Sequence, residues 1–193
     1  MQSVCVFCGS STGGNSAYTE AARSLGRTLA EANIRLVFGG GHVGLMGEIS
    51  NAALAADGDV IGVIPKFLVE RELAHEGLSD LRIVGSMHER KALMSDLSEA
   101  FIALPGGTGT LEEFFEVLTW AQLGEHDKPC GLLNVAGYYD PLLTVFDRMV
   151  EASFLSESNR ALLLVESEPE RLLQRFDHYE PPRRVKWIGR SET

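Results

Sequence analysis

Three glycine-rich turns are the part of this sequence best suited to binding a ligand. Each follows a short run of apolar residues, and they occupy residues 9–14, 39–44 and 105–110. Glycine lets backbone N–H groups approach a ligand closely, and the N-terminus of a helix after such a turn attracts negative charge. One turn would be weak evidence, but three together indicate a ligand that carries a phosphate group.

The residues around these turns exclude two familiar nucleotide-binding motifs. Residues 39–44 contain Gly-x-Gly-x-x-Gly, but the acid that should bind a ribose after the next strand is replaced by Ile-Pro-Lys at 64–66. A Walker loop requires a lysine after its last glycine, whereas Gly44 is followed by Leu45. We therefore expect a nucleotide or sugar phosphate that is held differently from NAD or ATP.

Glu113 lies three residues after Thr110 in the third turn, and this spacing has two interpretations. It matches a capping box, in which Thr110 would begin a helix. Ser86 and Glu89 repeat the spacing before another helical pattern, so chance alone can produce this spacing. Alternatively, the Glu113 carboxylate lies at the floor of the phosphate pocket, where it could stabilise a cationic transition state or activate a water. The spacing supports both interpretations equally.

Arg90 and Lys91 form an adjacent basic pair in a chain of net charge −10. Such a pair on a helix usually belongs to a solvated face. This pair, however, opens a helix directly after the fourth apolar run, at the edge where the ligand is expected. Arginine suits bidentate binding of phosphate, and both cations would offset the repulsion of an anion by the acidic protein.

Short apolar runs alternate with longer helical patterns along the chain, and these elements must position the turns. Helical spacing begins after Ser16, which we expect to cap the first helix, and recurs from Leu111 and from Leu142. The alternation predicts an α/β fold: a single-domain, Rossmann-like, doubly wound parallel sheet of about seven strands with helices on both faces. The turns would then share its carboxyl edge, where ligands bind. The predicted strands are residues 3–8, 34–38, 60–64, 81–84, 100–104, 131–133 and 162–165.

Length and composition bound the remaining possibilities. The 193 residues fit one domain, which we place at 1–178, with a basic and flexible tail at 179–193. The acidic charge argues against a nucleic-acid or anionic-membrane surface. No apolar stretch approaches the roughly 20 residues of a transmembrane helix, and no signal peptide is apparent, which predicts a cytoplasmic protein. Cys5 and Cys8 lie in the first predicted strand and are expected to be buried thiols, and the five scattered histidines predict no metal site.

Three motifs together resemble the LONELY GUY family. They are GGHVGLMG at 40–47, MHERK at 87–91 and PGGTGTLEE at 105–113. The resemblance covers most of residues 3–155, continuing through 119–124, 128–129 and 132–139. One departure is Thr108, at a variable motif position where plant members usually have tyrosine. That departure leaves the glycine scaffold intact and bears on substrate preference.

Members of this family are cytokinin riboside 5′-monophosphate phosphoribohydrolases, some under the older label "possible lysine decarboxylase". The resemblance implies hydrolysis of the N-glycosidic bond of an N6-modified adenosine 5′-monophosphate, without a cofactor, in a homodimer with its site near the interface. It implies that Arg90 and Glu113 are catalytic, since Glu112 occupies a variable position. The substrate-binding residues predicted from the turns and the resemblance are Gly9, Ser10, Gly40, Gly41, Gly44, Glu72, Met87, Lys91, Gly106, Gly107, Thr108, Gly109, Thr110 and Thr119.

Two alternatives to a cytokinin-specific enzyme remain open at this point. One is a general hydrolase of AMP and other nucleoside monophosphates, and the other is a nucleotide-binding carrier on the same scaffold. The presence of Arg90 together with Glu113 favours an enzyme, because a pure binder has no need of a carboxylate near a phosphate. A pyridoxal-dependent decarboxylase needs a Schiff-base lysine, and the only lysines are Lys66, Lys91, Lys128 and Lys186.

Overall fold

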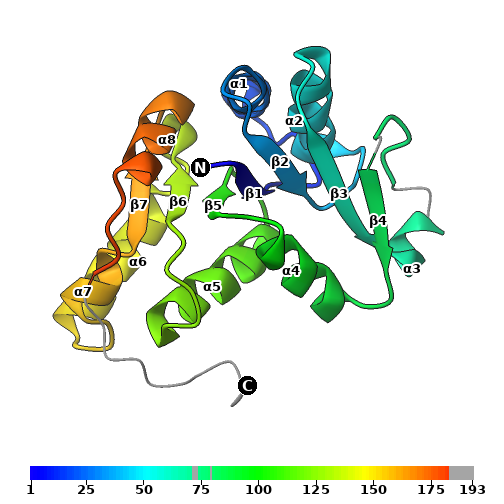
Figure 1. Ribbon diagram of the computed structural model, residues 1–193. Helices are drawn as coiled ribbons and strands as arrows, with labels where there is room; N and C mark the ends of the chain where they lie inside the picture. The colour runs from blue at the N-terminus through cyan, green and yellow to red at the C-terminus, as the bar shows by residue number, and fades with distance from the viewer. Residues whose placement is uncertain (71–73, 79, 183–193) are drawn as a thin grey trace.

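Seven parallel strands form one sheet in the order β4-β3-β2-β1-β5-β6-β7 (Figure 1). The computed structural model describes residues 1–70, 74–78 and 80–182. The predicted sheet is confirmed, and each predicted strand end differs from the observed one by at most one residue. The strands are β1 Ser3–Phe7, β2 Arg35–Phe38, β3 Val60–Pro65, β4 Asp80–Val84, β5 Ala100–Ala103, β6 Cys130–Leu133 and β7 Leu163–Glu166.

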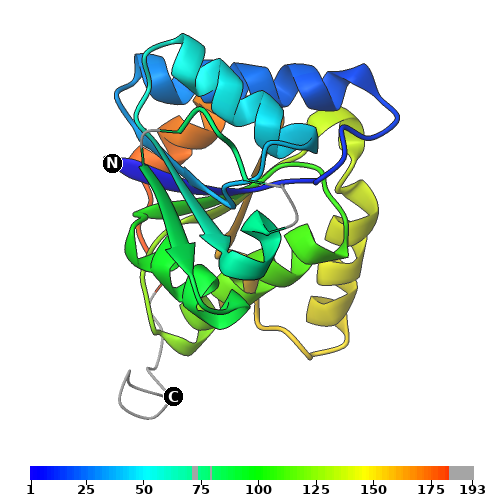
Figure 2. The same cartoon turned by 90° about the vertical axis from the view of Figure 1, so that its right-hand side faces the viewer.

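Helices cover both faces of the sheet, as predicted for a doubly wound fold (Figures 1 and 2). Helices α1, α2 and α8 pack on one face and α4, α5 and α6 on the other, and each face has its own apolar core. The helices are α1 Ser16–Glu31, α2 Gly44–Ala55, α3 Lys66–Val69, α4 Met87–Asp96, α5 Thr108–Leu123, α6 Asp140–Glu151, α7 Glu157–Arg160 and α8 Pro169–Asp177, with a 3-10 turn η1 at Val135–Gly137.

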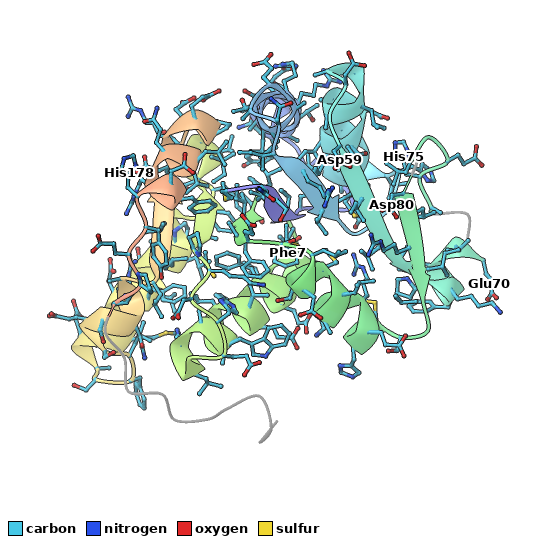
Figure 3. The ribbon with its side chains drawn as sticks, viewed as in Figure 1. Phe7, Asp59, Glu70, His75, Asp80 and His178 are labelled. Atoms are coloured by element: carbon cyan, nitrogen blue, oxygen red, sulfur yellow. The ribbon has the colours of Figure 1, made fainter. Side chains whose placement is uncertain are left out.

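The strands of the sheet centre are buried on both faces, which is why they are nearly continuous in apolar residues. Phe7 lies inside the molecule with its ring stacked 6.2 Å from that of Phe101, whereas Asp59 and Glu70 lie at the periphery (Figure 3). Cys5 and Cys8 are buried thiols, as predicted. Burial raises the pKa of both thiols, so neither is a reactive thiolate.

One predicted helix cap is wrong, and one of the two interpretations of Thr110 is excluded. Asn15, not Ser16, caps α1, because its Oδ1 accepts the N–H of Ala17 at 3.0 Å. The capping box of Thr110 with Glu113 does not form, since α5 begins at Thr108 with Gly107 as its N-cap, which places Thr110 inside the helix. Glycine at the N-cap leaves the first N–H groups of α5 to other partners.

The start of α4 does use the same spacing as a cap. Ser86 Oγ accepts the N–H of Glu89 at 3.1 Å, and the Glu89 carboxylate accepts the N–H of Gly85 at 2.7 Å. The second contact reaches one residue before the cap itself. This cap sets where α4 begins and therefore where Arg90 lies, in the first turn of the helix.

The order of the strands reverses beside β1, which has β2 on one side and β5 on the other. The three glycine-rich turns follow these three neighbouring strands, so they meet at one carboxyl edge of the sheet, as predicted. This switch point is where open α/β sheets bind ligands. The fold thus brings the turns together although 60 residues, 45–104, separate the second turn from the third.

The C-terminal boundary of the domain stays a prediction. Helix α8 ends at Asp177, and Tyr179 is partly buried against the apolar core of the face that α1, α2 and α8 cover. Residues 183–193, most of the predicted tail, lie outside the described residues. Among the helices of the described part of the chain, none combines the length and apolar character needed to cross a membrane.

Candidate active site

The turn after β1 lies between the other two glycine-rich turns and is bonded to both sides. Gly9 donates its N–H to Pro105 O at 3.1 Å and accepts the N–H of Leu45 at 3.0 Å. Gly44 has a left-handed backbone (φ +59°), and a Cβ there would overlap the backbone of Ser10. Glycine at position 44 is therefore needed both for its conformation and for this close approach.

A pocket of about 280 Å³ opens at this switch point. It is lined by the turns after β1 and β5 and by Tyr18, Leu45 and Tyr138. The remaining lining residues are Gly9, Ser10, Ser11, Thr12, Gly13, Pro105, Gly106 and Gly107. Four of the predicted substrate-binding residues, Gly9, Ser10, Gly106 and Gly107, are among them.

The N-terminus of α5 borders this pocket and is suited to an anion. Gly107, Thr108 and Gly109 are exposed, and α5 is 16 residues long. The first N–H groups of such a helix point out of its end and carry partial positive charge. Thr110 is buried, and a Cβ on Gly106 would overlap its hydroxyl, so glycine at 106 allows the turn to close against the helix. These residues could bind a phosphate without any basic side chain.

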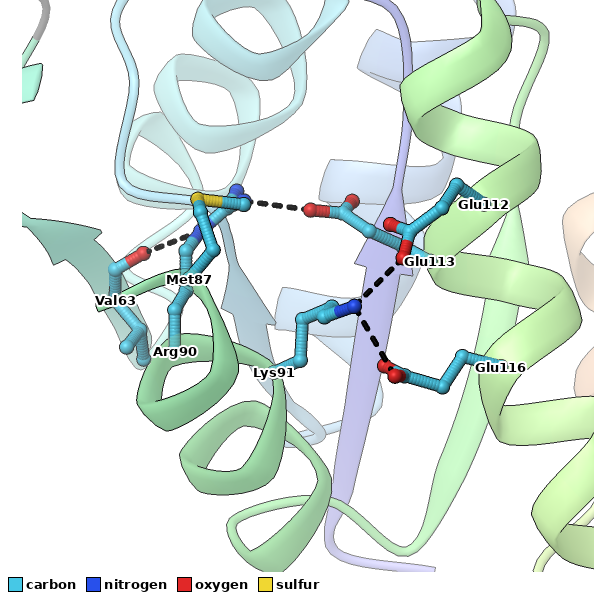
Figure 4. A network of polar contacts seen from close by, with 7 residues as sticks. All are labelled: Val63, Met87, Arg90, Lys91, Glu112, Glu113 and Glu116. Carbon is cyan, nitrogen blue, oxygen red and sulfur yellow. Dashed lines mark hydrogen bonds and ion pairs between the residues drawn. The ribbon is translucent and has the colours of Figure 1, made fainter.

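Arg90 and Glu113 form a buried ion pair between α4 and α5 (Figure 4). Arg90 Nη1 lies 2.5 Å from Glu113 Oε1, and the two side chains are 9% and 13% exposed. Arg90 Nε also donates to Val63 O within β3, at 3.1 Å, and Met87 Sδ lies 3.9 Å from Nη1. Both predicted catalytic side chains are therefore largely buried and do not lie on a solvated face. Their hydrogen bonds to each other and to Val63 O join residues distant in sequence.

Burial raises the pKa of the Glu113 carboxyl above its ordinary value of 4.5. The nearby charge of Arg90 and its hydrogen bond lower the pKa, and the charge of Glu112 raises it. The net direction is upward, so Glu113 is a stronger base than an exposed glutamate. A buried carboxylate held ionised by a single arginine is suited to stabilising positive charge or accepting a proton.

Gly39 makes room for Arg90, a role that its sequence context did not predict. A Cβ at Gly39 would overlap Arg90 Nη2 and lie 3.3 Å from Met46 Sδ. The three consecutive glycines at 39–41 were the available signal, but nothing local distinguishes the first from the others. Gly40 differs, since its backbone is left-handed (φ +72°) and its carbonyl accepts the N–H of His75 at 2.9 Å.

Lys91 points to α5 and not to the pocket. Its Nζ lies 2.6 Å from Glu112 Oε1 and 3.1 Å from Glu116 Oε1 (Figure 4). Burial lowers the pKa of Lys91, but hydrogen bonds to the two glutamates outweigh it and the net shift is upward. A lysine that forms a Schiff base needs the opposite shift, so Lys91 is a poor candidate for decarboxylase chemistry.

Three of the predicted substrate-binding residues remain. Thr119 is exposed on α5, about 9 Å along the helix from Glu113 at 1.5 Å per residue. Gly41 pairs with Ala74 in an isolated antiparallel bridge. Glu72 lies outside the described residues. Within the described ranges, no group of three or more His, Cys, Asp or Glu residues could hold a metal ion.

The fold and the site define a class of protein. It is a Rossmann-like α/β protein whose switch point carries backbone amides for an anionic ligand and, beside them, a buried arginine–glutamate pair. Tyr18, Leu45 and Tyr138 in the pocket wall were not among the predicted residues. Leu45 and Tyr138 fall in stretches that carry the family resemblance, but their position in the wall depends on packing between elements distant in sequence.

Comparisons with known proteins are consistent with this class. A family model described as "Possible lysine decarboxylase" matches residues 46–176. The cytokinin riboside 5′-monophosphate phosphoribohydrolase LOG3 of Arabidopsis thaliana is 52% identical over 178 residues, which cover 92% of this chain and 83% of the relative. The rice protein named "Probable cytokinin riboside 5′-monophosphate phosphoribohydrolase LOGL2" is 50% identical over 95% of this chain and 78% of its own length.

Solved structures agree on the fold. The molybdenum cofactor binding protein of Rippkaea orientalis superposes with a TM-score of 0.69 at 21% identity, over 92% of this chain and 97% of that one. At that identity the likeness concerns the fold alone. With about half of its residues identical to these relatives over nearly its whole length, the chain belongs to the LONELY GUY family of cytokinin riboside 5′-monophosphate phosphoribohydrolases.

Proposed function

We propose that this chain hydrolyses the N-glycosidic bond of cytokinin riboside 5′-monophosphates, releasing the free base and ribose 5-phosphate. Family membership at about 50% identity supports the reaction and the substrate class. The observation that carries the proposal is the buried contact of Arg90 with Glu113, next to the amide-rich start of α5. A site that only binds an anion has no use for a buried carboxylate at that place.

The 5′-phosphate binds the exposed amides at the start of α5 and in the turn after β1. The helix terminus supplies partial positive charge there, so an acidic chain can still hold a dianion. Phosphate at this end of the pocket places the ribose on the side of Glu113, which lies in the second turn of the same helix. Thr108 and Gly109, the first two residues of α5, are both exposed.

Glu113 acts on the ribose carbon whose bond breaks. As the C1′–N9 bond lengthens, its electron pair goes to the base and positive charge develops on the ribose. The water oxygen then bonds to C1′, and the proton it loses balances the one the base gains at nitrogen. A carboxylate beside C1′ can stabilise the cation or accept the proton of the water, and both roles require its ionised form.

Arg90 keeps Glu113 ionised and in place. Its charge lowers the pKa that burial raises, and its bond to Val63 O fixes the guanidinium against β3. Arg90 is also the basic side chain nearest to Glu113, so it is available to the phosphate or to the departing base. The predicted homodimer stays a proposal, in accord with exposed apolar side chains such as Ile83 and Phe154.

Product analysis tests this function. The purified protein is incubated with isopentenyladenosine monophosphate, AMP, GMP and the corresponding nucleosides, and the products are separated by chromatography. We expect free base and ribose 5-phosphate from the isopentenyl nucleotide and no product from nucleosides, which lack the phosphate. Comparable turnover of AMP would instead establish a general nucleoside-monophosphate hydrolase. Saturable binding of nucleotide with no base released would establish a carrier.

Two neighbouring variants test the role of Glu113. Glu113→Gln should lower kcat by about 10²-fold or more with substrate binding largely retained, because it removes the charge that acts on the transition state. Glu112→Gln is the matched control, since Glu112 is more exposed and bonds Lys91 and not Arg90. Near-wild-type kcat in Glu113→Gln would show that the carboxylate has only a structural role.

A further inference from the structure

Three consecutive carbonyl oxygens in the turn after β5 each accept a hydrogen bond from outside the turn. The donors are one backbone N–H and two tyrosine hydroxyls: Tyr139 Oη to Leu104 O at 2.6 Å, Gly9 N to Pro105 O at 3.1 Å, and Tyr138 Oη to Gly106 O at 2.6 Å. A free carbonyl oxygen at this place would repel a phosphate. The turn is therefore arranged so that its acceptors are occupied and its N–H groups are available.

The three peptide groups differ in how firmly the backbone itself restrains them. The Leu104–Pro105 peptide has no N–H, and the proline ring restricts its rotation. The Pro105–Gly106 peptide is bonded to the neighbouring turn through Gly9. The Gly106–Gly107 peptide lies between two glycines, which allow more backbone rotation than any other pair. Its carbonyl oxygen is held by the hydroxyl of Tyr138.

The orientation of this last peptide decides what an anion meets at the start of α5. In a trans peptide the C=O and N–H point in opposite directions, so the bond to Tyr138 directs the N–H of Gly107 away from the tyrosine. Rotation of the peptide would exchange a partial positive charge for a partial negative one. A phosphate would then face a carbonyl oxygen beside the helix terminus that is meant to bind it.

Backbone conformation and ring packing both restrain Tyr138. The two residues before it, Ala136 (φ +51°) and Gly137 (φ +72°), have left-handed backbone, which is costly for alanine and turns the chain sharply. Its ring packs edge-on against those of Tyr18 and Tyr139, with centroids 5.5 and 5.0 Å away. The hydroxyl therefore approaches Gly106 from a restrained ring, although 39% of Tyr138 is exposed.

We propose that Tyr138 is a positioning residue for the 5′-phosphate: its hydroxyl fixes the Gly106–Gly107 peptide so that the N–H faces the anion. This inference rests on the proposed function, because it concerns the phosphate of that substrate. Tyr138 acts through the peptide. Its loss should thus weaken ground-state binding of the phosphate and leave the chemical step, which depends on Arg90 and Glu113, nearly unchanged.

The test compares Tyr138→Phe with Tyr139→Phe, two variants that each delete one hydroxyl bonded to this turn. Tyr138→Phe should raise the Kd for ribose 5-phosphate, measured by calorimetry, and the KM for isopentenyladenosine monophosphate about tenfold, the worth of one charge-assisted hydrogen bond. Its kcat should stay within about twofold. Tyr139→Phe should lower the thermal stability, since Tyr139 is buried, but leave both constants near wild type, because the Leu104–Pro105 peptide has no N–H to direct.

The outcomes separate this inference from the proposed function. Wild-type affinity for ribose 5-phosphate in Tyr138→Phe, or equal affinity losses in both variants, would overturn the role of Tyr138. So would a wild-type protein that does not bind ribose 5-phosphate. Binding of ribose 5-phosphate requires no turnover, so a tenfold loss in Tyr138→Phe would support the inference even if the wild-type protein released no base. In that case only the proposed hydrolysis would fail.

Discussion

Replacing Gly39 by alanine should disable the site without altering Arg90 or Glu113 chemically. The backbone of Gly39 lies outside the left-handed region, so alanine can adopt it. The added methyl carbon would overlap Arg90 Nη2 and lie 3.2 Å from its Cζ, closer than the roughly 3.5–4.0 Å of an ordinary contact. The guanidinium must therefore move away from the end of β2.

The structure indicates how much this movement should cost. Relieving the overlap takes a shift of about 1 Å or more, and the Arg90 bonds to Val63 O at 3.1 Å and to Glu113 cannot both survive it. Misplacing a catalytic group by about 1 Å can cost about 10²-fold in rate. Losing one hydrogen bond to a charged group costs about 1.5–3 kcal/mol of stability. We expect kcat to fall about 100-fold and the protein to stay folded.

The assay measures base released from isopentenyladenosine monophosphate by wild type, Gly39→Ala, Arg90→Ala and the double variant. If the methyl group acts through Arg90, the double variant should be no slower than Arg90→Ala alone, because the displaced group is already absent. Gly26→Ala is a control that adds a methyl group to a crowded glycine far from Arg90. Wild-type kcat in Gly39→Ala, or independent and additive losses in the double variant, would refute the reasoning.

Two further predictions concern acid and packing. Burial raises the pKa of Glu113, and the proposed mechanism requires its ionised form. We therefore expect kcat to fall on acidification with a midpoint above 4.5. Full activity at pH 4.5 in protein shown to be folded by circular dichroism would contradict this. Gly26→Ala should lower the free energy of unfolding in urea by about 1–3 kcal/mol and leave kcat unchanged. The added Cβ would overlap Ile49 O and lie 3.1 Å from Ala53 N, so α1 and α2 must move apart. Unchanged stability would show that the two helices can separate at no cost.

Much of the fold could be predicted from the sequence. Strands buried on both faces must be apolar throughout, so each of the seven appears as a short continuous run, and the longer patterns between them can only be crossover helices. Parallel strands then place every strand exit on one edge, which brought the glycine-rich turns together. The strands, the crossover helices and the shared edge could be predicted because they depend on burial and on the direction of the chain. Both can be inferred from short stretches of sequence.

Helix starts were less predictable, for a physical reason. Ser16 and Thr110 both have side chains that cap helices, yet Asn15 and Gly107 occupy those positions. Capping depends on which residue leaves the helical conformation, and neighbouring candidates differ by only a few tenths to about 1 kcal/mol. Packing at the switch point, where Gly106 closes against Thr110, outweighs a preference of that size.

The sequence by itself determined the parallel α/β sheet, the edge at which its three glycine-rich turns meet and, through its motifs, the family. Tertiary structure alone decided what the functional side chains touch. Arg90 meets Glu113 across 23 residues, and Tyr138 meets Gly106 across 32, while Gly39 leaves the space that the arginine fills. The pattern of residues around each of these positions is compatible with several partners. Packing of α4, α5 and the strand ends decides which partner each side chain contacts. Burial there makes an unpaired charge or carbonyl group energetically costly.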